Sequence, residues 1–178
     1  MITSNENSAK LYEINKLVGG TLGAFEAWLA LRGLKTLSLR VRQQCANAQM
    51  IAEWLCAQTR IARVNYPGLR DHPQHALAQK QFHARGFGGV LSFEIRDADR
   101  AQTFRFMESL ELCLAATTLG DIYTLALHPA TSSHRSLTAE QRAQVGITEG
   151  LVRLSVGIED VEDIRADLAR ALSKMVPE

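Results

Sequence analysis

Residues 151–160 read LVRLSVGIED, and the apolar part of this stretch is typical of a strand inside a β-sheet. Side chains alternate along a strand, so Arg153 lies on the face opposite Val152 and Leu154 and on the same face as Ser155. A guanidinium is almost never fully buried unless an anion meets it. The pattern therefore predicts an anionic partner for Arg153.

The residues alone leave two partners open for Arg153. An Asp or Glu from elsewhere in the chain would form an ion pair with it. A ligand carboxylate or phosphate would instead receive two parallel hydrogen bonds from the guanidinium, a geometry that arginine provides better than lysine. Composition does not distinguish between these two readings.

Composition limits the classes of protein to which the chain can belong. Its 178 residues are 46% hydrophobic and 22% charged, with a formal net charge of +1, which is typical of a globular domain. The sequence contains no block of basic residues, so nucleic acid is not an expected partner. Apolar runs extend for only a few residues, far short of the ~20 that span a bilayer, so no membrane segment is expected.

The N-terminus and the cysteines bear on where in the cell the protein is located. The first ten residues, MITSNENSAK, are polar and lack the apolar core of a secretory signal. Cys45, Cys56 and Cys113 are odd in number and show no CxxC spacing, which favours reduced thiols. We therefore expect a cytoplasmic protein.

The first third of the chain is predicted to be largely helical. Residues 1–10 are read as a loose polar lead, and the helical pattern from Leu11 to about Thr59 is interrupted at Val18-Gly19-Gly20. Apolar residues from Leu37 to Leu55 recur at three- and four-residue steps, as on one face of a long helix. We expect residues 1–60 to form an N-terminal segment with a long connecting helix, and residues 61–178 to form one α+β folding unit.

Short strands alternate with helices in the rest of the chain, and their short connections indicate mostly antiparallel pairing with helices on one face. The expected fold class is α/β, more narrowly α+β. Asp97, Thr138 and Asp160 are read as N-caps of helices. The expected strands cover residues 63–66, 90–95, 112–116, 122–127 and 151–158.

Other candidate residues carry less chemical information than Arg153. Thr117 and Thr118 either close a strand or present a hydroxyl beside a ligand. His72 and His75 lack the further ligands that a metal site requires, so we expect no metal. No spacing indicates a Ser-His-Asp or Cys-His arrangement, and the residues by themselves yield no complete active site.

Five stretches, in this order and spacing, resemble the C-terminal half of the Cys/Met-metabolism enzymes that use pyridoxal phosphate. That family includes cystathionine γ-synthase, cystathionine lyases, methionine γ-lyase and O-acetylhomoserine sulfhydrylase. The resemblance extends from about residue 11 to 175. The stretches are RGLKTL (32–37), YPGL (66–69), GGVLSFEI (88–95), TTLGDIYTLALHPATSSH (117–134) and GLVRLSVGIEDVEDI (150–164).

The resemblance implies roles for three residues in binding an amino-acid substrate. It implies the C-terminal domain of a fold-type I enzyme, in which the arginine at position 153 holds the substrate α-carboxylate. Thr118 matches a small polar residue near that carboxylate, and Thr117 stands where many members carry an acidic residue. These features are closer to the methionine γ-lyase and sulfhydrylase branch, with γ-elimination or γ-replacement on sulfur amino acids or O-acylhomoserine.

The chain departs from the family in its cofactor residues. The family's lysine that binds pyridoxal 5'-phosphate lies in an S-x-T-K segment, and Lys10, Lys16 and Lys35 do not sit in that motif. We therefore assign no catalytic and no cofactor-binding residue to this chain and expect a fragment that is inactive alone. The family's tendency to form tetramers implies a homo-oligomer. The alternatives are a non-catalytic split or degenerate subunit that associates with a full-length relative, and a stand-alone amino-acid-binding domain.

Overall fold

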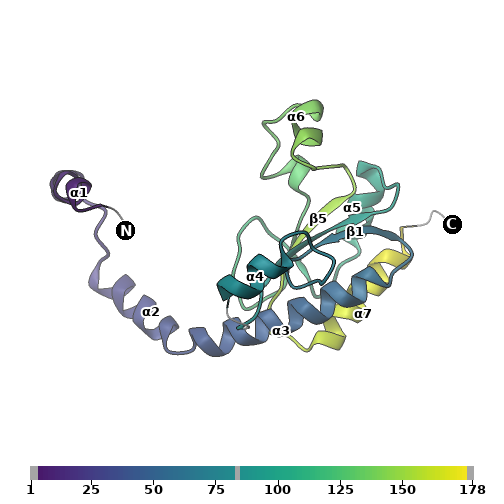
Figure 1. The fold of residues 1–178 in the computed structure, drawn as a ribbon, viewed down its shortest axis with the longest axis horizontal. Helices are drawn as coiled ribbons and strands as arrows, with labels where there is room; N and C mark the ends of the chain where they lie inside the picture. The colour runs from purple at the N-terminus through teal and green to yellow at the C-terminus, as the bar shows by residue number, and fades with distance from the viewer. Residues whose placement is uncertain (1–3, 83–84, 176–178) are drawn as a thin grey trace. The chain divides into compact units, whose positions relative to one another are not determined.

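The computed structural model describes residues 4–82 and 85–175, which group into two compact units (Figure 1). The first unit ends at Ser38 and the second begins at Leu39. The helix α3 (Leu37–Cys56) begins at the end of the first unit and continues into the second.

The first unit consists of α1 (Asn5–Val18), α2 (Ala24–Leu34) and the start of α3. The polar lead expected over residues 1–10 is wrong from Asn5 onward, because the Ser4 side chain accepts a hydrogen bond from the N–H of Asn7 and starts α1 there. Neither α1 nor α2 contains a buried residue. Large apolar side chains such as Phe25 and Trp28 are 65% and 53% exposed.

The second unit contains a five-stranded sheet in the order β1-β2-β5-β4-β3. The predicted antiparallel pairing is confirmed for β1–β2, β2–β5 and β5–β4, whereas β3 and β4 pair in parallel because the chain crosses back between them. The described elements of this unit, besides α3, are β1 (Ile61–Asn65), α4 (His75–Phe82), β2 (Val90–Ile95), α5 (Arg100–Glu108), β3 (Leu114–Ala115), β4 (Leu125–Leu127), η1 (Pro129–Thr131), α6 (Ala139–Gln144), β5 (Leu151–Ser155) and α7 (Val161–Ser173). Residues 83–84, directly after α4 in the sequence, lie outside the described residues.

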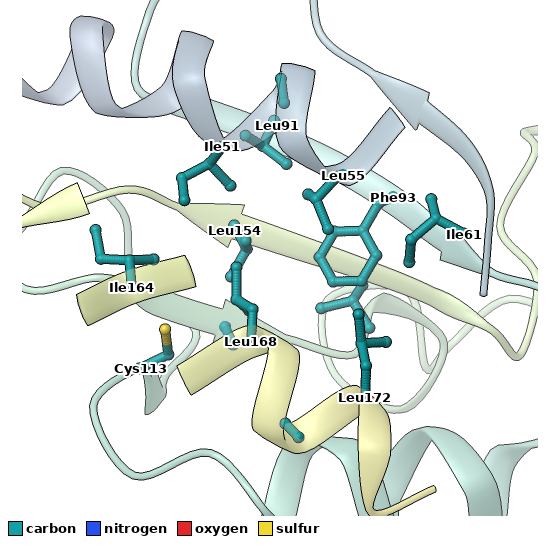
Figure 2. Packing of buried hydrophobic residues seen from close by; sticks show 14 of the residues in the cluster. Ile51, Leu55, Ile61, Leu91, Phe93, Cys113, Leu154, Ile164, Leu168 and Leu172 are labelled. Carbon is teal, nitrogen blue, oxygen red and sulfur yellow. The ribbon is translucent and has the colours of Figure 1, made fainter. Parts of the chain in front are cut away.

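One face of the sheet carries the hydrophobic core, as predicted. Alternate residues of β2 and β5, such as Phe93 and Leu154, are fully buried on that face. Three helices, α3, α5 and α7, supply the other side of the same cluster, and Figure 2 shows side chains such as Leu55 and Leu168 gathered there. The rings of Phe93 and Phe106 meet edge to face at 5.8 Å between centroids. The helices therefore leave the opposite face, which carries Arg153, for other contacts.

Helix caps follow the sequence signals with one correction. Thr138 forms a capping box with Gln141, and Asp160 accepts a hydrogen bond at the start of α7, as expected. The N-cap of α5 is Asp99 rather than Asp97. Asp97 instead has a φ of +53°, so it turns the chain between β2 and α5 before the helix can begin.

Candidate functional site

Arg153 lies on the central strand of the sheet, between β2 and β4. Its partners in the two antiparallel registers are Ser92 and Leu127. Val152 and Leu154 on either side are fully buried in the core. The predicted alternation is confirmed, since Arg153 is half-buried on the face away from the helices.

The Arg153 side chain meets backbone carbonyls and no carboxylate. Its Nη2 donates to the carbonyl oxygens of Thr117 at 3.1 Å and Thr118 at 3.2 Å. Its Nε is buried and has no hydrogen-bond partner in the part of the chain that the structure describes. Over residues 4–82 and 85–175, no Asp or Glu oxygen lies within 4 Å of the guanidinium, so the ion-pair reading of the sequence is not what the structure contains.

Burial also acts on the charge of Arg153. Partial desolvation lowers the pKa of its guanidinium from the ordinary value, because the charged form loses water without gaining an anion. An arginine side chain is effectively always protonated in a protein, so the group stays a cation. The site therefore holds a cation whose buried Nε–H has no partner, an arrangement that favours an added anion.

The segment from Thr117 to Thr124 is held by hydrogen bonds just after the residues that contact Arg153. Gly120 N–H donates to Ser155 Oγ at 3.0 Å, and Ile158 N–H donates to the Ile122 carbonyl at 2.9 Å. The Gln44 side chain on α3 donates to the Asp121 carbonyl at 2.6 Å. These bonds fix the carbonyls that orient the guanidinium.

Glu159 anchors the far end of the same segment, and sequence reasoning missed it. Its carboxylate accepts from Thr124 N–H at 2.6 Å and Thr124 Oγ at 2.9 Å, and that hydroxyl accepts from Gly157 N–H at 2.9 Å. Asn47 on α3 donates to the Gly157 and Glu159 carbonyls. A carboxylate directly after the apolar strand is the signal in the sequence, but its partner is 35 residues away.

The structure brings Thr117 and Thr118 to Arg153 through their backbone and not through their hydroxyls. Both residues are exposed. The sequence suggested a hydroxyl beside a ligand, and that role stays a prediction. What the structure adds is that the two carbonyls hold the guanidinium from one side, with Nη2 occupied and Nε left unpaired.

A cavity of about 330 Å³ opens beside Arg153 on the face away from the helices. This volume suits a small organic molecule. Polar groups that sequence reasoning had not assigned line it: Asn65 donates to Ser92 Oγ at 3.3 Å, and Ser133 Oγ lies 2.9 Å from His134 Nδ1. Register across the sheet and the return of the loop after β4 bring these residues to Arg153, and neither can be read from local sequence.

The cavity's residues suit a carboxylate, but they do not supply an attachment for pyridoxal phosphate. The described residues that line it include one arginine and no lysine, so none of them could bind the cofactor aldehyde. In the part of the chain that the structure describes, no group of three or more His, Cys, Asp or Glu residues is placed to hold a metal ion. Within the same residues, no helix is both long and apolar enough to cross a bilayer.

Comparison with known proteins identifies the relatives of this chain. L-methionine gamma-lyase of Pseudomonas putida is 45% identical over 163 residues, covering 92% of this chain and 40% of the relative. O-succinylhomoserine sulfhydrylase of Pseudomonas aeruginosa is 44% identical over 160 residues, with 90% and 39% covered. The chain thus spans about two fifths of the length of these relatives.

Solved structures give the same result for the fold. The cystathionine gamma lyase CalE6 of Micromonospora echinospora matches with a TM-score of 0.89 and 38% identity, over 97% of this chain and 44% of that one. Cystathionine gamma synthase of Xanthomonas oryzae, solved with aminoacrylate and cysteine, matches with a TM-score of 0.87 and 41% identity, over 97% and 44%. Residues 1–173 match the family described as Cys/Met metabolism PLP-dependent enzymes. The fold is therefore that of part of a fold-type I enzyme, and the chain belongs to the Cys/Met-metabolism family of pyridoxal-phosphate-dependent enzymes.

Proposed function

We propose that this chain is the C-terminal part of a transsulfuration-type enzyme and that Arg153 binds the α-carboxylate of its amino-acid substrate. The observation that carries the proposal is a half-buried guanidinium with no carboxylate partner among the described residues and a buried Nε–H left unpaired. The names of the relatives support γ-elimination or γ-replacement on sulfur amino acids or O-acylhomoserine.

Arg153 contributes orientation to such a reaction. Two parallel hydrogen bonds to a carboxylate fix both the position and the rotation of a substrate, which raises the fraction held in a reactive geometry. The carbonyls of Thr117 and Thr118 hold the guanidinium in place before a ligand arrives, so less side-chain entropy is lost on binding. Pyridoxal phosphate, when bound in the complete enzyme, serves as the electron sink, and no residue of this chain is assigned to a step of that chemistry.

We also propose a cellular location and an oligomeric state for the enzyme. Cys45, Cys56 and Cys113 are free thiols, which agrees with a cytoplasmic enzyme. We propose a homotetramer for the complete enzyme, and we expect the chain alone to be inactive.

The carboxylate role is tested by titrating the chain with L-methionine while following the Arg153 Nε–H resonance by NMR. L-methioninamide, which has the same side chain and no carboxylate, is the matched control ligand. L-methionine is expected to shift the resonance with a Kd of about 1–10 mM, as for a single charge-assisted contact, and L-methioninamide is expected to leave it unchanged.

Two variants make this titration specific. Arg153→Gln is expected to abolish the carboxylate-dependent changes in the surrounding backbone resonances, including Ser92. Arg105→Gln, an exposed position on α5, is expected to keep them. Equal shifts with both ligands, or no shift with either, would show that Arg153 is not a carboxylate site.

A second candidate is a non-catalytic subunit that associates with a full-length relative. The exposed apolar side chains of α2, including Phe25, Trp28, Leu31 and Leu34, favour it because patches of this kind mark interaction surfaces. It predicts a stable complex in gel filtration after coexpression with a full-length relative. Separate elution of the two chains would remove this candidate and leave the carboxylate role unaffected.

A further inference from the structure

A second cavity, of about 980 Å³, lies in the same compact unit and shares no lining residue with the cavity beside Arg153. Four segments form it: α3, the turn after β1, α4 and the glycine-rich loop before β2. From its charges, its apolar surface and its fixed walls we infer that it binds a small organic molecule with at least two negative charges and an apolar portion. This site is independent of the function proposed for Arg153.

The cavity concentrates positive charge that no ion pair among the described residues neutralises. Arg42, Arg70 and Arg85 come from three of its segments, and none of their side chains forms an ion pair or hydrogen bond with another described residue. Glu53 is the one acidic residue among the described residues of the lining, and it accepts a hydrogen bond from the Gln49 side chain at 2.7 Å.

Counted from Arg, Lys, Asp and Glu alone, three arginines against one glutamate give the described lining residues a net charge of +2, whereas the whole chain carries only +1. Like charges gathered around one concavity repel one another and attract an anion. Arginine binds phosphate and carboxylate in the same bidentate geometry, so the charges define an anionic ligand without choosing between these groups.

The lining also contains apolar side chains, which indicate that the ligand has an apolar portion. Leu69 and Phe87 line the cavity, and the ring of Phe87 lies 5.4 Å from the ring of His75 between centroids. The Nδ1 of His75 lies 2.8 Å from the Pro67 carbonyl, which fixes that ring. A bare inorganic anion would leave this apolar surface wet, whereas a ligand with an aromatic or aliphatic portion would cover it.

Two glycines in the lining of the cavity lie close to α3. A Cβ at Gly68 would stand 2.1 Å from Gln49 Oε1, and a Cβ at Gly86 would stand 2.6 Å from Cys45 Cβ. Gly86 also has a φ of +105°, which a residue with a side chain rarely adopts. The loop therefore approaches α3 closely because Gly86 lacks a side chain, and Arg85 directly before it lines the cavity.

The site is tested by titrating the chain calorimetrically with three probes: phenyl phosphate, phthalate and inorganic phosphate. Phenyl phosphate or phthalate is expected to bind at least about fivefold more tightly than inorganic phosphate, because only these cover the apolar lining. A preference for phenyl phosphate would assign a phosphate monoester, and a preference for phthalate would assign a dicarboxylate. Inorganic phosphate binding as tightly as the other two would overturn the proposed ligand class.

Substitutions locate the bound probe. Arg42→Gln, Arg70→Gln and Arg85→Gln are each expected to weaken binding of the tighter probe by about fivefold, the upper end of what an exposed ion pair contributes. Arg135→Gln, an exposed arginine outside both cavities, should leave the affinity unchanged. Since the three arginines are exposed and unpaired, their variants should melt like the parent protein. Binding that none of the three variants weakens, or no binding of any probe, would overturn the inference.

Discussion

Replacing Asp167 with asparagine is expected to lower the free energy of unfolding at pH 7 by about 3 kcal/mol, measured by urea denaturation. The Asp167 carboxylate is 5% exposed and accepts hydrogen bonds from three consecutive backbone N–H groups. Oδ1 receives Glu111 at 2.9 Å, and Oδ2 receives Leu112 at 3.0 Å and Cys113 at 2.8 Å. Arg170 donates to the same carboxylate. An asparagine offers a single acceptor oxygen and turns an NH₂ toward buried donors.

The same carboxylate makes the stability of the protein depend on pH. Burial by itself would raise the pKa of Asp167, but the backbone hydrogen bonds from Cys113, Glu111 and Leu112 outweigh it and hold the pKa below the ordinary value of 3.8. A folded-state pKa below the unfolded one contributes stability that is fully present above about pH 4 and is lost as the pH falls through the folded-state value. The difference in stability between the parent protein and Asp167→Asn should therefore shrink below about pH 4.

Asp163→Asn is the matched control, because Asp163 is exposed one turn earlier on α7. It should change the free energy of unfolding by no more than about 0.5 kcal/mol. If Asp167→Asn proved as mild as the control, the backbone hydrogen bonds would not be the anchor described above. The anchor also matters for the site, since residues 111–113 lead through β3 into the Thr117–Thr118 carbonyls that hold Arg153.

Much of the fold could be predicted from local sequence, because period and capping are local properties. The long helix ending near Leu55, the strand over 90–95 and the Asp160 cap all agree with the structure. The parallel pairing of β3 with β4 could not be predicted, because strand direction depends on where the intervening chain crosses. The predicted cap of α5, Asp97, lies two residues before the actual cap, Asp99. Only the backbone geometry distinguishes the two aspartates.

The site was predictable in its central residue and not in its surroundings. Arg153 stands out because a charge interrupts an apolar strand, and alternation alone gives its face. Its contacts with Thr117 and Thr118 span 36 and 35 residues of sequence and use backbone carbonyls, which every residue type carries. Asp167 did carry a signal, since it occupies the buried stripe of α7 between Ile164 and Leu168.

Arg153→Gln is expected to raise the KM for L-methionine at least about 100-fold in an active chimera, because loss of a bidentate charge pair typically costs 2–5 kcal/mol. The chimera joins this chain to the preceding part of Pseudomonas putida L-methionine gamma-lyase, in place of the segment to which it is 45% identical. The KM of Arg153→Lys should lie between those of the parent chimera and Arg153→Gln, because lysine keeps the charge and lacks the planar guanidinium. A fall in kcat should accompany the rise in KM, because a substrate held by one contact is poorly oriented.

The most direct measurement is therefore the KM for L-methionine of the chimera with Arg153, compared with its Arg153→Gln and Arg105→Gln variants at equal cofactor occupancy. The carboxylate role predicts a KM raised about 100-fold in Arg153→Gln and unchanged in Arg105→Gln. A KM for Arg153→Gln within about threefold of the parent chimera, less than one good hydrogen bond is worth, would contradict it, and so would a chimera that holds the cofactor but turns over no substrate.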